Sequence, residues 1–159
     1  MVLPVICHRL HTGVNKLFFS SSDPMNEKHK QTIVGLILTL TVLLVYWQVQ
    51  YFNFVNYDDQ VYVTANLHVQ KGLTAENVKW AFTAKDAGFW HPLTWLSLML
   101  DYQLFKLNPA GYHWTNLLFH LASTLLLFLV LQRMTGALWR SGFVAALFAL
   151  HPLHVESVA

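Results

Sequence analysis

The sequence predicts an all-α membrane protein with two full transmembrane helices, a truncated third, and an outward loop of short interfacial helices. Of its 159 residues, 55% are hydrophobic and only 11% are charged. In soluble domains, about a quarter of the residues are charged. Two long stretches, 31–57 and 107–132, contain no charged residue. The single cysteine, Cys7, excludes an internal disulfide. A formal net charge of +2 is too small to indicate binding to nucleic acid.

Residues 1–30 are polar and mildly basic, and we expect them to form a poorly ordered cytoplasmic tail. The next segment, 31–52, is long enough to cross a hydrocarbon layer of ~30 Å, which takes about 20 residues. Aromatic residues gather at its far end, as in the interfacial belts of membrane helices. A cleaved signal peptide would have a shorter apolar core and a small-residue cleavage site. We therefore interpret 31–52 as a retained first transmembrane helix.

Residues 53–110 hold most of the acidic residues and show short helical patterns. Thr74 is a typical N-cap residue, and Glu76 would lie in the first turn of the helix that follows. That helix is predicted to end near Phe82. A second helix is predicted to begin at Pro92, because proline is favoured at the first helical position. Its uncharged stretch is too short to cross a bilayer, so we expect it to lie at the membrane surface or to re-enter it.

The second transmembrane helix is predicted at 111–132, and a turn with an arginine at each end follows at 133–140. Residues 141–159 begin a third apolar helix, which we expect to be truncated. Lysine and arginine favour the cytoplasmic ends of membrane helices, so the tail and this turn are predicted to be cytoplasmic. The loop 53–110 would then face outward. Small residues typical of close helix packing share one face of the third helix: Gly142, Ala145, Ala146 and Ala149.

The acidic pair Asp58–Asp59 is the leading candidate for chemistry, because it follows the first transmembrane helix directly. A carboxylate at a membrane surface, partly covered by aromatic residues, can take a proton from a hydroxyl group or bind a metal ion. The alternative is structural, with Asp58 as the cap of a short helix from Asp59 to Leu67. The two interpretations are compatible.

Histidines supply the other candidates. His113, Asn116 and His120 share one face of the second transmembrane helix, where polar residues mark a functional path or join helices by hydrogen bonds. The end of the sequence holds another polar cluster: His151, His154 and Glu156. Its spacing differs from that of a zinc-protease helix. We therefore interpret it as an interfacial cluster and predict no metal site.

Four segments resemble a known family in their order along the chain. They are Phe54–Asp59 (FVNYDD), Trp90–Ser97 (WHPLTWLS), Gly111–His120 (GYHWTNLLFH) and His151–Ala159 (HPLHVESVA). The sequence resembles bacterial membrane proteins with C-terminal tetratricopeptide repeats, which are similar to the TMTC-type O-mannosyltransferases of animals.

This resemblance implies a GT-C glycosyltransferase fold and the transfer of a sugar from a polyprenyl-phosphate donor to an acceptor hydroxyl. The reaction would take place on the outer face of the membrane, the periplasmic face in a bacterium. The resemblance implies that Asp58 is the general base and that Asp59 assists or orients it. The residues implied for donor or substrate binding are His91, His113, His151, His154 and Glu156.

The implied partners are the bilayer, the lipid-phosphate-linked sugar and the remaining transmembrane helices of a longer protein, with neither nucleic acid nor a certain cofactor. As an N-terminal part, this chain is expected to be inactive alone. Two other functions stay open from the residues. One is a non-enzymatic membrane anchor or assembly module for C-terminal tetratricopeptide repeats. The other is a small transporter-like subunit that uses the His113, Asn116 and His120 face, in which substitution of His120 would matter more than substitution of Asp58.

Overall fold

The computed structural model describes residues 24–55, 57–85 and 88–158, and all regular elements in these ranges are helices. Two helical stretches, Asn26–Tyr51 and Pro109–Thr135, are long and apolar enough to cross a membrane. Together they confirm the predicted all-α membrane class. Residues 1–23 of the predicted poorly ordered tail lie outside the described residues. The chain divides into two compact units, residues 1–34 and 35–159, and the packing below concerns the second.

The first long helix, α2 (Pro24–Val45), begins before the predicted start of the transmembrane segment. Glu27 lies in its first turn, where the positive end of the helix dipole favours a carboxylate. Glu27 also accepts a hydrogen bond from Lys30 Nζ at 2.8 Å, one turn along the helix. Residues 24–30 are therefore helical, although we predicted them as part of the tail. A 3₁₀ turn, η1 (Trp47–Tyr51), follows α2.

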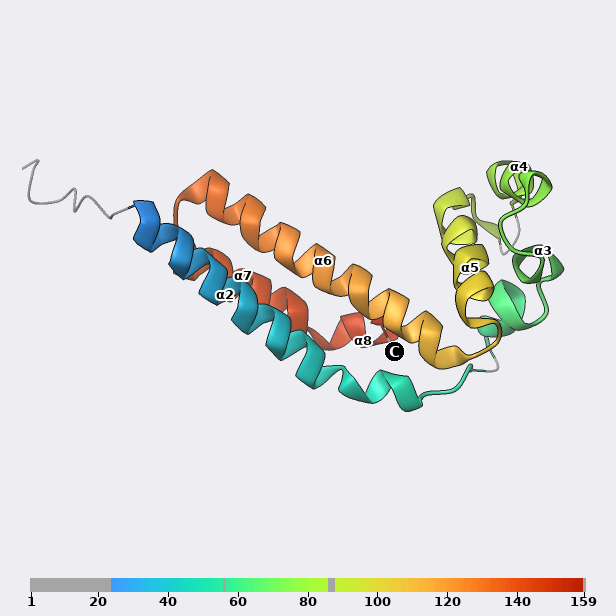
Figure 1. Ribbon diagram of the computed structural model, residues 1–159, viewed down its shortest axis with the longest axis horizontal. Coiled ribbons are helices and arrows are strands. Elements are labelled where there is room, and N and C mark those ends of the chain that lie inside the picture. Colours follow the sequence, from blue (N-terminus) through green and yellow to red (C-terminus); the bar gives the residue numbers. More distant parts are fainter. Residues whose placement is uncertain (1–23, 56, 86–87, 159) are drawn as a thin grey trace, which may run out of the picture. The chain divides into compact units, whose positions relative to one another are not determined.

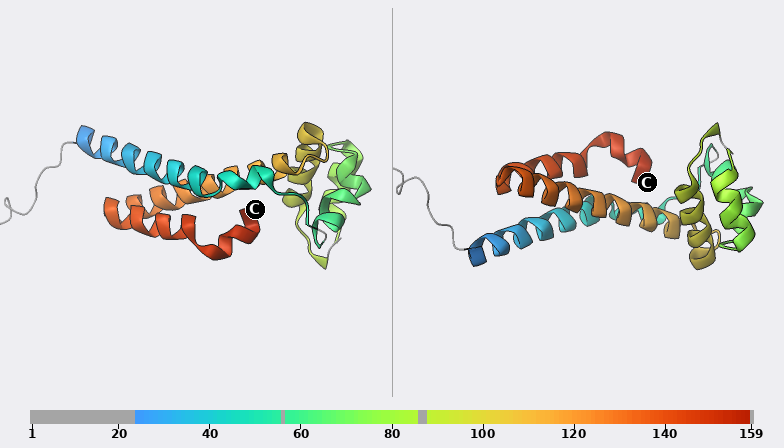
Figure 2. Two further views of the ribbon diagram at one scale, coloured as in Figure 1. Left: turned by 90° about the horizontal axis from the view of Figure 1, so that it is seen from below. Right: turned by 90° about the horizontal axis from the view of Figure 1, so that it is seen from above.

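The helices α6 (Pro109–Thr135) and α7 (Leu138–Leu150) run antiparallel and side by side (Figures 1 and 2). Gly136 ends α6 in the left-handed conformation with φ of 67°, which a glycine adopts without steric strain. Of the small residues on this face of α7, Gly142, Ala145 and Ala149 are buried and Ala146 is partly exposed. Ala149 shares a hydrophobic cluster with Leu117 of α6. Small side chains thus let α7 approach a neighbour within the same chain.

Four short helices form the segment between α2 and α6 and gather beyond the first turns of α6 (Figure 1). They are the π-helix η2 (Gln60–Thr64), α3 (Leu67–Gln70), α4 (Ala75–Thr83) and α5 (Pro92–Phe105). The Thr74 side chain caps α4 by accepting a hydrogen bond from the Asn77 N–H at 3.2 Å. This cap and the start of α5 at Pro92 confirm the sequence predictions. The core of the segment is fully buried: Val69, Ala81, Trp95 and Met99.

The connection between α5 and α6 requires a glycine at position 111. A methyl group added to Gly111 would overlap the Cβ atom and ring of Phe105, the last residue of α5. The absence of a side chain at Gly111 therefore lets the end of α5 fold back on the first turn of α6.

Replacing Gly111 with alanine is expected to destabilise the protein by about 1–3 kcal/mol, because overpacking forces neighbouring groups to shift. The measurement is thermal unfolding of the detergent-solubilised protein. Gly35→Ala is the matched control, because a methyl group there meets no atom within 4 Å. That change in a helix interior is expected to be neutral or slightly stabilising. Equal unfolding temperatures for Gly111→Ala and the wild type would contradict the proposed close approach.

Candidate functional site

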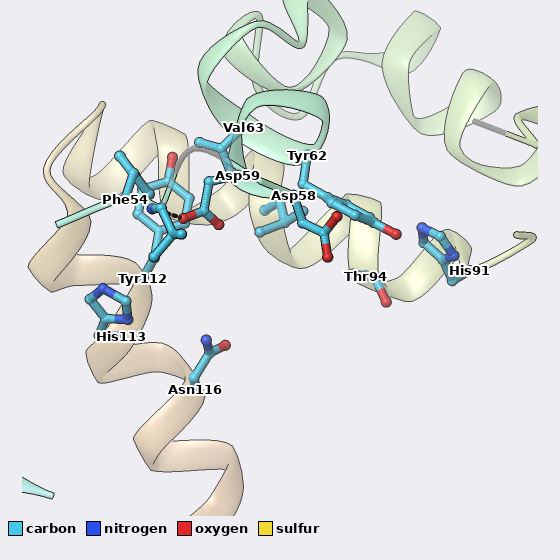
Figure 3. A pocket seen from close by; sticks show the side chains of 12 residues that line it. Phe54, Asp58, Asp59, Tyr62, Val63, His91, Thr94, Tyr112, His113 and Asn116 are labelled. Atoms are coloured by element: carbon cyan, nitrogen blue, oxygen red, sulfur yellow. Dashed lines mark hydrogen bonds between the residues drawn. The ribbon is translucent and has the colours of Figure 1, made fainter. Parts of the chain in front are cut away.

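A cavity of about 750 Å³ lies between the acidic segment after α2, the start of α5 and the first turns of α6 (Figure 3). Its lining includes four residues implied above for catalysis or for donor binding: Asp58, Asp59, His91 and His113. Tyr62, Thr94, Tyr112 and Asn116 line it as well. Residues far apart in the sequence therefore meet at one place, where the second apolar span begins.

The two carboxylates of the pair have different surroundings. Asp59 Oδ2 accepts a hydrogen bond from the Val55 N–H at 2.6 Å, which closes the turn before η2. Figure 3 shows the Asp58 carboxylate turned into the cavity between Tyr62 and Thr94, while Asp59 is turned to the other side. Asp58 is exposed and Asp59 only partly so. Asp59 thus holds the backbone of the turn, and Asp58 faces the cavity.

The Asp58 side chain does not form the helix cap of the structural alternative. Its carbonyl group accepts a hydrogen bond from the Tyr62 N–H at 3.0 Å at the start of the helical turn, but its carboxylate accepts none from a described residue. The Asp59 side chain makes no cap hydrogen bond to η2 either. The helix predicted from Asp59 to Leu67 is also interrupted after Thr64. Asn66 interrupts it because its side-chain oxygen accepts hydrogen bonds from two backbone N–H groups of the next helix, α3.

Two imidazole rings in the cavity wall have nitrogen atoms without a hydrogen-bond partner among the described residues. They are both ring nitrogens of His113 and the Nε2 atom of His91. The His113 side chain is only 8% exposed, and its ring packs edge-on against Phe52 at 6.3 Å between centroids. Buried polar atoms normally have a partner. The wall of the cavity thus contains imidazole nitrogens that are buried and have no partner among the described residues.

The structure places three other histidines, His120, His151 and His154, around the end of α7 and outside the cavity lining. The His120 Nε2–H donates to the Ala149 carbonyl at 3.0 Å, and the His154 Nδ1–H donates to the Phe148 carbonyl at 2.8 Å. Both bonds satisfy carbonyl groups in the last turn of α7, which lack partners within the helix. His151 Nδ1 accepts from the Leu153 N–H at 3.2 Å. These contacts give the three rings a structural role at the end of α7.

The residues of the polar face predicted on the second transmembrane helix therefore lie at two different places in the structure. His113 and Asn116 line the cavity, whereas His120 contacts the end of α7. The side chain of Glu156 lies outside the described residues. Among the described residues, no group of three or more His, Cys, Asp or Glu side chains is placed to hold a metal ion.

Sequence reasoning missed Asp101, a lone acid in the apolar helix α5. Its side chain is 5% exposed, and its Oδ1 accepts a hydrogen bond from Thr115 Oγ1 of α6 at 2.7 Å. Burial raises the pKa of Asp101, and the hydrogen bond from Thr115 opposes this rise. The link joins the helix that carries Thr94 to the helix that carries His113, so it connects two walls of the cavity. A single acid among apolar residues was the available signal.

The contribution of Asp101 to the stability of the wild type is expected to fall as the pH rises above 3.8, the ordinary pKa of an aspartate. A raised pKa in the folded state means that folding favours the protonated carboxyl, so this contribution is lost as the pH rises through the folded-state pKa. Asp101→Asn keeps an oxygen acceptor for Thr115 and removes the charge. The unfolding temperature of the variant minus that of the wild type is therefore expected to increase with pH. A difference that is constant across this range would contradict the assignment.

Comparison with known proteins identifies relatives over most of the chain. The protein O-mannosyl-transferase Tmtc1 of Drosophila melanogaster is 36% identical over 124 residues, which are 70% of this chain and 14% of the relative. The human protein O-mannosyl-transferase TMTC3 is 30% identical over 141 residues, which are 84% of this chain and 15% of the relative. This chain is similar to TMTC-type O-mannosyltransferases.

The Drosophila Tmtc2 is a further TMTC relative, at 34% identity over 111 residues, or 65% of this chain and 12% of the relative. The predicted resemblance to TMTC-type enzymes is thus confirmed. The chain spans only a small part of the length of each of these relatives. No family model and no solved structure matches the chain.

Proposed function

We propose that the cavity belongs to a membrane glycosyltransferase of the TMTC type. It would transfer mannose from a polyprenyl-phosphate carrier to a hydroxyl group of an acceptor protein on the outer face of the membrane. The observation that carries this proposal is that one cavity is lined by an exposed carboxylate, Asp58, and by two imidazoles, His91 and His113, with nitrogens that lack a partner among the described residues. The similarity to protein O-mannosyltransferases supports the choice of reaction.

Asp58 is the proposed general base. In the transfer step, the acceptor oxygen forms a bond to the anomeric carbon of mannose, and the bond from that carbon to the phosphate oxygen breaks. The phosphate leaves with the electron pair, and the hydroxyl proton passes to Asp58. This role needs a carboxylate with oxygen atoms facing the substrate, and the position of Asp58 in Figure 3 meets that need.

Asp59 is the proposed orienting residue. Its hydrogen bond to the Val55 N–H fixes the turn from which Asp58 projects. A rigid turn matters because a misplaced catalytic group loses much of its effect. The two neighbouring acids would therefore have separate roles. Asp58 would contact the acceptor, and Asp59 would hold the backbone of the turn.

His91 and His113 are the proposed ligands of the donor phosphate. Of the described residues that line the cavity, none is lysine or arginine, so imidazole N–H groups are the strongest donors there. Hydrogen bonds to a charged phosphate are stronger than those to neutral groups.

The cavity position suits a substrate held at a membrane surface. Tyr112, His113 and Asn116 lie in the first turns of α6, where the apolar span Pro109–Thr135 begins. We propose that this end faces outward and that the arginine-bearing turn at 133–140 is cytoplasmic. Because the TMTC relatives are much longer, we also propose that further transmembrane helices complete the site. His151, His154 and Glu156 would then act on the substrate site indirectly, by contact with those further helices.

The test uses membranes that contain the protein bearing this sequence, a radiolabelled mannosyl phosphoryl polyprenol and a mixture of unfolded acceptor proteins. Label that becomes covalently attached to protein through a serine or threonine oxygen is the expected result. Membranes without the protein are the control. Absence of transfer, with the protein correctly inserted, would favour the anchor or assembly role instead.

A further inference from the structure

A second cavity lies at the other end of α6, where the chain turns into α7. Its volume is about 210 Å³. Three of its lining residues are polar and three are apolar: Arg140, Thr135 and Ser141, and Leu131, Ala137 and Val144. It shares no lining residue with the cavity around Asp58, so it is separate from the candidate site described above.

Arg140 has no anionic partner in the part of the chain that the structure describes. It is exposed and forms no salt bridge there, and the sequence holds no aspartate or glutamate between residues 102 and 155. Arg140 lies in the first turn of α7, which has no acidic residue and no side-chain cap. The positive end of the helix dipole adds to the charge of the guanidinium group in that turn. An anion in the cavity would therefore be attracted by both.

The hydroxyl group of Ser141 has no close partner among the described residues. Ser141 is 3% exposed, and its Oγ lies 3.4 Å from Thr135 Oγ1, longer than the usual ~2.5–3.0 Å of a bond between two hydroxyl groups. Thr135 Oγ1 already donates to the Leu131 carbonyl at 2.7 Å and accepts from the Ala137 N–H at 3.2 Å. The polar lining of the cavity thus combines a cation without a counter-ion and a hydroxyl group with only a long contact.

We propose that this cavity binds the phosphate group of an anionic phospholipid. The inference does not depend on the proposed mannose transfer. The cavity lies at the end of the apolar span Pro109–Thr135, and Trp139, beside Arg140, is 71% exposed. An exposed tryptophan at the end of a membrane helix is typical of the headgroup region. Basic pockets between membrane helices on the cytoplasmic side bind anionic headgroups, and that is the side proposed above for this turn.

The size and the lining of the cavity favour a lipid over free phosphate. A volume of about 210 Å³ corresponds to about seven water molecules at ~30 Å³ each. This space fits a phosphate group and the first atoms of its esters, but not the acyl chains. The chains would leave the cavity past Leu131, which is partly exposed, and Val144, which is exposed. Apolar contact with these two side chains adds binding energy that inorganic phosphate lacks.

The test measures lipid binding to the detergent-solubilised full chain by native mass spectrometry. Dioleoyl phosphatidylglycerol is expected to bind more tightly than dioleoyl phosphatidylcholine, which has no net charge. Arg140→Gln is expected to weaken the binding of phosphatidylglycerol about tenfold, because hydrogen bonds from a charged group to the phosphate are lost. The fold is expected to survive this change, because Arg140 is exposed. Equal affinity of the wild type for the two lipids would overturn the proposal.

Arg133→Gln is the matched control. Arg133 is the other arginine of this turn, lies exposed in the last turn of α6 and does not line the cavity. Its substitution removes the same charge and is expected to change the affinity for phosphatidylglycerol little. Equal losses in the two variants would overturn the proposal, because they would indicate a general attraction between the basic turn and anionic headgroups.

Thermal unfolding gives a second measurement of the same site. Phosphatidylglycerol is expected to raise the unfolding temperature of the wild type and of Arg133→Gln more than that of Arg140→Gln, because a ligand that binds only the folded state stabilises it. The same rise in all three proteins would contradict the assignment to this cavity.

Competition with inorganic phosphate identifies the source of the anion. Inorganic phosphate at the concentration of the lipid is expected to leave phosphatidylglycerol bound. Displacement of the lipid under these conditions would overturn the lipid assignment. None of these measurements requires mannose transfer, so their failure would leave the proposed function in place, and a failure of transfer would leave the lipid site in place.

Discussion

Replacing Asp58 with asparagine is expected to lower the rate of mannose transfer by about 10²- to 10⁴-fold, the usual contribution of a general base. The amide has nearly the shape of the carboxylate but cannot take the acceptor proton. Because Asp58 is exposed and its carboxylate makes no hydrogen bond with a described residue, the substitution removes the base and leaves the described contacts in place. Transfer from the labelled donor is the measurement, and the protein level and membrane insertion of the variant are checked in parallel.

The neighbouring acid gives the control for this experiment. Asp59→Asn keeps a side-chain oxygen for the Val55 N–H, so it is expected to preserve the turn and to lose much less activity than Asp58→Asn. Asp59→Ala removes the acceptor and is expected to loosen the turn, with a loss of transfer that accompanies greater proteolysis before η2. Full activity in Asp58→Asn, or a larger loss in Asp59→Asn, would remove Asp58 from the proposed role.

The fold class followed from the sequence because its physical cause is local. A stretch without charge, long enough to cross a bilayer, predicts a membrane helix wherever it occurs. The cap at Thr74 and the helix start at Pro92 were predictable for the same reason, since each residue acts on the backbone within one turn of itself. The interruption at Asn66 was missed because an asparagine can cap a new helix or be tolerated inside an old one.

The candidate site was predictable only in part, because spacing along a helix does not say which element lies beside each residue. His113 and His120 share a face in the sequence pattern, yet one lines the cavity and the other bonds to the end of α7. Asp101 was missed because nothing near it in the sequence shows that two helices bury it and that Thr115 bonds to it. His91 and Asp58 line the same cavity because of the way α5 packs. That packing cannot be predicted from the residues that are near them in the sequence.

That packing depends on Trp95, and replacing Trp95 with alanine is expected to cost about 3–5 kcal/mol, the usual range for a buried tryptophan. Its side chain is 0% exposed and forms part of the core of the short-helix segment. Its ring stacks on Tyr62 at 5.2 Å and lies 4.9 Å from His91, between ring centroids. Both neighbours line the cavity. Loss of the indole would therefore release two walls of the site together with the core.

Hydrogen exchange and limited proteolysis of the segment between α2 and α6 measure this effect, and mannose transfer is expected to fall with them. Trp95→Phe is the informative partner variant. The Trp95 Nε1 has no hydrogen-bond partner among the described residues, so phenylalanine keeps an aromatic ring and gives up no hydrogen bond. We expect it to retain most of the protection that the alanine variant loses. Similar losses in both variants would contradict the inference that an aromatic ring at this position is sufficient to support Tyr62 and His91.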